Sequence, residues 1–113
     1  MKDPLILVQH ALECVARVER FTVAGESEFH RSELIQGAVL HNLQAMAQSI
    51  MQLSESFKST HPEVDWRGLG GFRNVLVHDY LGVSVSRVWE IVQRDLPAVR
   101  LALEAMHRDI GSA

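Results

Sequence analysis

The segment Ile35–Phe57, IQGAVLHNLQAMAQSIMQLSESF, decides the fold of this chain. Apolar residues recur in it at intervals of four and three, the spacing of a helix that packs along one face. The positions of this seam are Ile35, Val39, Asn42, Met46, Ile50, Leu53 and Phe57. Asn42 is its polar member, and such a residue can fix helix register or the pairing of two chains. The segment predicts one long, packed helix.

A first helix is predicted to begin at Asp3-Pro4, because aspartate caps free amide groups and proline fits the first helical position. It extends to about Phe21, and residues 22–27, which include Gly25, are predicted to form a turn. The apolar stripe of this helix consists of Leu5, Val8, Leu12, Val15 and Val18.

The second half of the chain is predicted to be helical as well. The long helix ends before Pro62, because proline disfavours helix at the residue that precedes it. A shorter motif helix is expected over about residues 66–82. Ser84 or Ser86 is expected to cap a last helix, and Pro97 is expected to kink it. The stripe of the last helix consists of Val88, Val92, Leu96, Val99, Leu103 and Met106.

Length and composition fit one domain, residues 1–113. Apolar residues make up 47% and charged residues 22% of the chain, with a net charge of −3, as in an ordinary globular protein. No strand pattern occurs, so we expect an all-α, up-and-down bundle of four to five helices. No apolar run is long enough for a membrane span, and we expect that the first residues are not a secretory signal. The single cysteine, Cys14, excludes an internal disulfide, and we expect a cytoplasmic location.

Residues 70–80, GGFRNVLVHDY, carry the candidate chemistry. On a helix, Leu69, Phe72, Val75 and Leu76 share one side. Arg73, Asn74, His78 and Tyr80 lie on the side turned away from that stripe. The six histidines of the chain are scattered, with no pair at three- or four-residue spacing, so no metal site is predicted.

Arginine and histidine together suit the cleavage of RNA. Near neutral pH an imidazole can take up or return a proton, and a guanidinium can offset the charge that grows on a phosphate. The 2′-hydroxyl of RNA supplies the nucleophile, so neither metal nor cofactor is needed. Arg73 and His78 point about 140° apart on an ideal helix. A two-fold dimer would bring two copies of the motif to one groove.

The motif resembles that of HepT-like toxins, which are HEPN-domain ribonucleases. Four residues separate Arg73 from His78, and one residue separates His78 from Tyr80. Gly71-Phe72 precedes the arginine, and Asn74 follows it. Three flanking segments are also similar to the family pattern. They are Arg31–Ile35, Pro62–Trp66, and Val88–Val92 with Asp95–Pro97. The resemblance covers about residues 3–108.

The resemblance implies a HEPN-like helical bundle that forms a two-fold homodimer with RNA as substrate. Arg73 and His78 would be the catalytic residues, with Asn74 and Asp79 as supporting polar groups. An MntA-type nucleotidyltransferase antitoxin would AMPylate Tyr80, which places negative charge and bulk in the groove. Many family members carry Gly-Glu in the second helix where this chain has Ala47-Gln48.

Two other functions remain open at this point. The chain could be a non-catalytic subunit that binds nucleotide or substrate for a minimal nucleotidyltransferase, or it could be a purely structural dimer. Trp66 and Trp89 could stack on bases, but we expect them to anchor the core or an interface. Cys14 is expected to be a small buried apolar residue.

Overall fold

The computed structural model describes residues 3–67 and 84–112, with side chains for 3–67 and 84–110. A π-helical turn, η1 (Ile91–Asp95), joins helix α6 (Val85–Glu90) to helix α7 (Leu96–Ser112). No strand occurs in residues 3–67 or 84–112, so the predicted all-α fold class is confirmed. The helices are α1 (Pro4–Phe21), α2 (Glu26–Arg31), α3 (Glu33–Met51), α4 (Glu55–Ser59), α6 (Val85–Glu90) and α7 (Leu96–Ser112).

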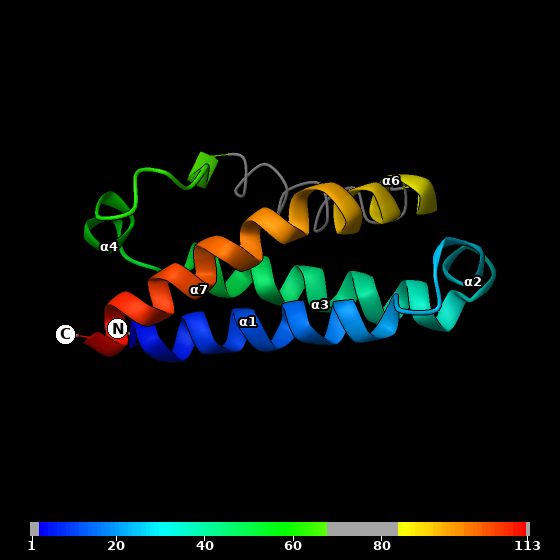
Figure 1. Cartoon of the computed structure of the whole chain (residues 1–113), viewed down its shortest axis with the longest axis horizontal. Helices are drawn as coiled ribbons and strands as arrows, with labels where there is room; N and C mark the ends of the chain where they lie inside the picture. The colour runs from blue at the N-terminus through cyan, green and yellow to red at the C-terminus, as the bar shows by residue number, and fades with distance from the viewer. Residues whose placement is uncertain (1–2, 68–83, 113) are drawn as a thin grey trace.

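The three long helices form the body of the bundle. α1 lies beside α3 along most of its length and also packs against α7 (Figure 1). α3 and α7 both run in the direction opposite to α1, so both chain ends lie at one end of the molecule (Figure 1). The short helix α2 lies at the other end, where it contacts α3 and α6.

The start of α1 follows from its first two residues. The Asp3 carboxylate accepts a hydrogen bond from the Leu5 amide at 2.9 Å, and Pro4 occupies the first helical position. This predicted cap is confirmed. Of the predicted stripe, Val8, Val15 and Val18 are buried. Cys14 is buried among them, as predicted.

The turn after α1 is shorter than predicted. Residues 26 and 27 were expected in the turn, but Glu26 begins α2, and the boundary falls at Gly25. Gly25 has φ 96°, a backbone conformation that side-chain-bearing L-residues rarely adopt, and this ends the turn there. A Cβ placed on Gly25 would meet no atom within 4 Å. Phe29 of α2 is buried, and its ring lies 5.3 Å from that of Trp89.

The long second helix is interrupted, which corrects the prediction of one continuous helix up to Pro62. α3 ends at Met51, and the Ser54 hydroxyl accepts a hydrogen bond from the Phe57 amide at 3.1 Å to begin α4. Serine bonds local backbone amides readily and therefore favours a cap over helix continuation. Within α3, Asn42 is buried in the seam, and its Nδ2 donates to the Ala38 carbonyl at 2.8 Å.

The last helical stretch begins at Ser84, whose hydroxyl accepts from the Arg87 amide at 3.1 Å. Ser84 is therefore the cap, and Ser86 is not. The irregularity expected at Pro97 occurs just before it, in the five residues Ile91–Asp95. In η1 the Leu96 amide donates to the Ile91 carbonyl, five residues back. A proline ring crowds the carbonyl four residues earlier, and a π-helical turn relieves such crowding.

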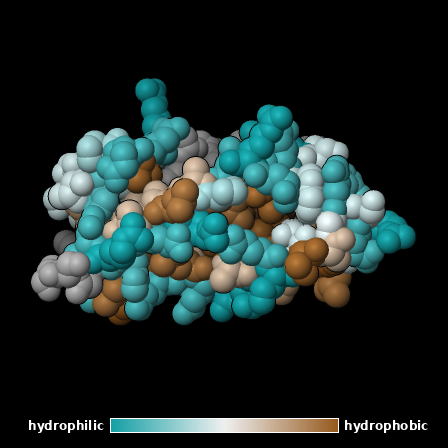
Figure 2. All heavy atoms as spheres, in the orientation of Figure 1, coloured by the Kyte–Doolittle hydropathy of each residue, from teal (hydrophilic) through white to brown (hydrophobic). Residues whose placement is uncertain are grey.

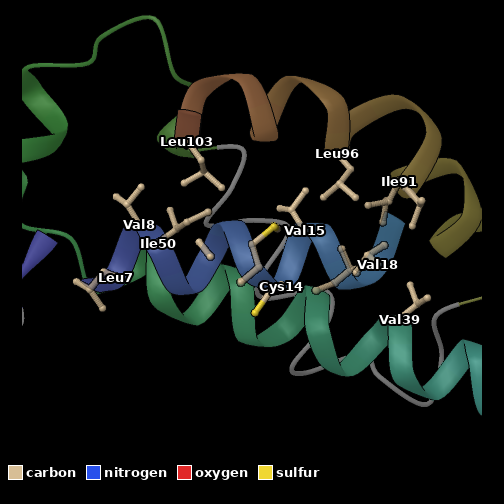
Figure 3. Packing of buried hydrophobic residues seen from close by; sticks show 14 of the residues in the cluster. Leu7, Val8, Cys14, Val15, Val18, Val39, Ile50, Ile91, Leu96 and Leu103 are labelled. Carbon is tan, nitrogen blue, oxygen red and sulfur yellow. The ribbon is translucent and has the colours of Figure 1, made fainter. Parts of the chain in front are cut away.

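The core lies where α1, α3 and the η1–α7 stretch face one another. Figure 3 shows side chains from all three converging, among them Val15 of α1, Ile50 of α3 and Leu103 of α7. Full burial of one such aliphatic side chain contributes about 1.5–3 kcal/mol. Trp66 and Trp89 pack against this cluster, which confirms the expectation that they anchor the core.

The visible surface is mostly hydrophilic, with separate hydrophobic spots (Figure 2). Among the described residues, the large apolar side chains that are exposed are Ile6, Val23, Leu34, Met51 and Leu101. Across residues 3–67 and 84–112, no helix has both the length and the apolarity needed to cross a membrane.

Candidate functional site

The predicted site residues lie in the segment 68–83, outside the residues that the structure describes. These residues are Arg73, Asn74, His78, Asp79 and Tyr80. Their roles therefore stay predictions from the sequence. The structure does define the residues on both sides of the segment, and these fix where it leaves and rejoins the bundle.

The chain enters the segment from Trp66 and Arg67, which are helical. The predicted motif helix at about residues 66–82 otherwise lies outside the described residues. The indole Nε1–H of Trp66 donates to two carbonyl oxygens, of Lys58 at 3.1 Å and of His61 at 3.0 Å. The Lys58 ammonium lies 6.0 Å from the centre of the indole ring. These contacts hold Trp66 against the connection between α3 and the segment 68–83, which consists of residues 52–67 and includes α4.

His61 occupies the centre of that connection and is only 5% exposed. Its Nε2 lies 3.0 Å from Asp109 Oδ2 on α7, and its Nδ1 lies 2.9 Å from the Thr60 hydroxyl. The Thr60 hydroxyl itself donates to the Phe57 carbonyl at 2.6 Å. Both ring nitrogens of His61 thus have oxygen partners, which offsets the cost of burying a polar ring.

The chain leaves the segment at Ser84, which caps α6. Just beyond this cap, the Glu90 carboxylate forms ion pairs with Arg87 at 3.3 Å and with Arg94 at 3.2 Å. Trp89 packs on Phe29 of α2. A tryptophan therefore packs against the bundle on each side of the segment 68–83: Trp66 before it, with directed hydrogen bonds, and Trp89 after it, beside ion pairs that lie within the α6–η1 stretch.

Other titratable groups do not form a second site in the described part of the chain. His10 Nδ1 lies 2.5 Å from the buried Ser49 hydroxyl, and Cys14 Sγ lies 3.8 Å from His10 Nε2. Burial raises the pKa of the Cys14 thiol, although nearby Arg17 partly opposes this, so the sulfur is a poor nucleophile near neutral pH. Within residues 3–67 and 84–112, no three His, Cys, Asp or Glu side chains are grouped to hold a metal ion.

The sequence did not indicate the contact between His61 and Asp109. The structure shows that His61 is a buried structural residue. Its partner lies 48 residues away on another helix, so no local pattern could have paired them. The residue order His61-Pro62 at the end of a helix was the available signal, and it indicated only the end of that helix.

Comparison with known proteins identifies the class of protein. The family model described as "Ribonuclease HepT-like" matches residues 11–106, a range that includes the motif at 70–80. This match and the helical fold define an all-α enzyme of the RNA-cleaving class. The chain belongs to the HepT-like ribonuclease family, which confirms the resemblance noted from the sequence.

Three relatives show how far the similarity extends. "Probable ribonuclease HepT" of Thermococcus cleftensis is 30% identical over 98 residues, which are 85% of this chain and 88% of that protein. "Putative RNase TTE0752" of Caldanaerobacter subterraneus subsp. tengcongensis is 28% identical over 98 residues, 86% of this chain and 88% of that protein.

The third relative is longer. "Gamma-glutamylcyclotransferase and putative RNase MJ0434" of Methanocaldococcus jannaschii is 28% identical over 100 residues. The aligned region is 88% of this chain and 45% of that protein, so the chain spans about half its length. No solved structure matches the chain significantly.

Proposed function

We propose that this protein is a metal-independent endoribonuclease toxin in which Arg73 and His78 are the catalytic residues. The observation that supports this most is the family match over residues 11–106, because it spans the arginine–histidine motif. The chemistry of the two side chains supports it independently. They supply proton transfer and phosphate binding without a metal.

The proposed reaction uses the ribose as its own nucleophile. His78 takes the proton of a 2′-hydroxyl, and the freed oxygen forms a bond to the adjacent phosphorus. The bond from phosphorus to the 5′-oxygen breaks, and an imidazolium returns a proton to that oxygen. Arg73 offsets the charge on the five-coordinate phosphorus. The products are a 2′,3′-cyclic phosphate and a 5′-hydroxyl.

A two-fold homodimer would complete this site. Arg73 and His78 are five positions apart and diverge on a single helix, so one copy of the motif holds one phosphate poorly. Two copies that face one groove would supply two arginines and two histidines. One histidine can then act as base while the other acts as acid, with Asn74 and Asp79 as supporting polar groups.

Regulation through Tyr80 follows from the same placement. We expect an MntA-type nucleotidyltransferase antitoxin to attach AMP to the Tyr80 hydroxyl. The added phosphate lies two positions from His78 in sequence and would compete with RNA for the arginine. Intact mass should rise by one or more AMP units on co-expression with the antitoxin, and Tyr80→Phe should abolish the increase.

The activity test uses protein purified without any antitoxin and a fluorescently labelled RNA in buffer with EDTA. The wild-type protein should release fragments that end in a 2′,3′-cyclic phosphate. A 2′-deoxy nucleotide at the cleaved position should block cleavage there. Arg73→Ala should lower the rate about 10²- to 10³-fold, and His78→Ala about 10²- to 10⁴-fold.

Two matched variants serve as controls. His41 is an exposed histidine of α3, and Arg31 is a surface arginine that pairs with Glu28 at 2.8 Å. His41→Ala and Arg31→Ala should cleave within about twofold of wild type, since both are exposed and neither belongs to the motif. Nucleotide binding without any RNA cleavage by the wild-type protein would instead favour a binding subunit of a nucleotidyltransferase.

A further inference from the structure

A cross-fold contact reaches the connection that precedes the motif. The connection, residues 52–67, runs from the end of α3 through α4 to Trp66. Its buried imidazole, His61, meets Asp109 near the end of α7 at 3.0 Å. α4 and the last turns of α7 lie at the same end of the molecule (Figure 1).

His61 makes several hydrogen bonds to other residues of the connection. Its backbone amide donates to the Lys58 carbonyl at 3.0 Å, and its carbonyl accepts from the Val64 amide at 3.2 Å. The same carbonyl accepts from the Trp66 indole. Its ring also packs on Phe57, with centroids 5.0 Å apart. A shift of residue 61 that moves its backbone carbonyl would therefore move the acceptor of the Trp66 indole, two residues before position 68.

Leu53, at the start of the connection, is buried in the core. Beyond it, apolar burial alone holds the connection weakly, because α4 has no fully buried residue and Phe57, Val64 and Trp66 are only partly buried against the core. The direction of the chain at Trp66 therefore depends on a few directed polar contacts. The Asp109 side chain is 68% exposed, whereas the His61 ring that it contacts is buried. The position of Asp109 is therefore set mainly by α7, the helix that carries it.

We propose that His61 and Asp109 are positioning residues for RNA cleavage. Their contact sets the direction in which the chain leaves Trp66 toward Arg73, seven residues further on. This inference rests on the proposed function, because it assigns the pair to the reaction of Arg73 and His78. Neither residue touches the RNA. Catalysis is sensitive to displacements of about 1 Å, so a modest change of direction reaches the chemical step.

The test compares two substitutions of one carboxylate. Asp109→Ala removes the acceptor, whereas Asp109→Asn keeps an oxygen that can accept from His61 Nε2. Asp109→Ala should lower kcat about tenfold and leave KM within about twofold, and Asp109→Asn should restore most of kcat. Glu104→Ala, which removes a carboxylate from the same helix, and Glu63→Ala, in the connection itself, should leave both constants unchanged.

A spectroscopic measurement reports directly whether Trp66 moves when the contact between His61 and Asp109 is lost. With 5-fluorotryptophan incorporated, the two tryptophans give two ¹⁹F resonances, which Trp89→Phe assigns. The Trp66 resonance should shift in Asp109→Ala and return in Asp109→Asn. His61→Gln serves as a second disruption, and combined with Asp109→Ala it should lower kcat no further than either change alone.

The outcomes separate the two proposals. If folded Asp109→Ala keeps the wild-type kcat and its Trp66 resonance does not move, the positioning role is overturned. The proposed function still holds in that case, provided that the wild-type protein cleaves RNA. A lowered Tm with normal kcat in the folded variant also overturns it, because the contact would then be purely structural. Absence of cleavage by the wild-type protein overturns the proposed function, and the positioning role with it.

Discussion

The buried hydroxyl of Ser49 on α3 and the exposed imidazole of His10 on α1 are joined by a hydrogen bond of 2.5 Å. The two partners differ in access to water, and this makes the two deletions unequal. A buried donor or acceptor left without a partner costs more than an exposed one, which water can satisfy.

His10→Ala should therefore destabilise the protein more than Ser49→Ala. We expect about 1–3 kcal/mol for His10→Ala, because it leaves the Ser49 hydroxyl buried without its partner. Ser49→Ala should cost about 1 kcal/mol or less, since His10 can bond water instead. Urea unfolding followed by circular dichroism measures both values, and the reverse order would contradict the argument.

A second prediction concerns the cap of α6. Ser84→Ala should destabilise the protein by about 0.5–2 kcal/mol, because the Arg87 amide loses its partner. Ser86→Ala, two residues further on, is the matched control and should change stability by less than about 0.5 kcal/mol. Equal effects of the two substitutions would show that the cap contributes nothing.

A third prediction compares two leucines of α7. Leu103 is 1% exposed and lies in the core, whereas Leu101 is 63% exposed. Leu103→Ala should cost about 2–5 kcal/mol, because it removes buried methyl groups and leaves a cavity. Leu101→Ala should stay within about 0.5 kcal/mol of wild type. Thermal unfolding of the two variants tests the packing of α7 on α1.

A fourth prediction concerns the Cys14 thiol. Burial raises its pKa, so the thiolate forms at higher pH in the folded protein than in the unfolded chain. Iodoacetamide at neutral pH should alkylate the native protein far more slowly than protein unfolded in guanidinium. The unfolded chain loses this proton first, so the free energy of unfolding should fall as pH rises past the ordinary thiol pKa. Equal alkylation rates in the two states would contradict this.

The features that sequence predicted correctly are local ones. Asp3 and Ser84 cap helices through amides only two or three residues away, and the buried stripe of α1 follows from its own spacing. The break at Ser54 was missed because Leu53 and Phe57 continue the apolar spacing across it. A seam of correct period therefore does not establish that the helix is continuous.

The same distinction between local and long-range features applies to the candidate site. The arginine–histidine spacing was visible in the sequence, as was the family to which the chain belongs. The contact between His61 and Asp109 was not, because it exists only once α7 has packed at the end of the bundle where residue 61 lies. Sequence patterns identify groups with suitable chemistry, whereas long-range contacts depend on the completed fold.

Gly25 leads to a consequence of another kind. Its φ of 96° and the open space where a Cβ would lie show that handedness, and not room, excludes other residues there. For a mirror-image amino acid, this backbone conformation is an ordinary extended one. D-Alanine introduced at position 25 by chemical synthesis should therefore adopt this backbone conformation without strain. It would also restrict the freedom of the unfolded chain, and so stabilise the native protein by about 0.4–1 kcal/mol.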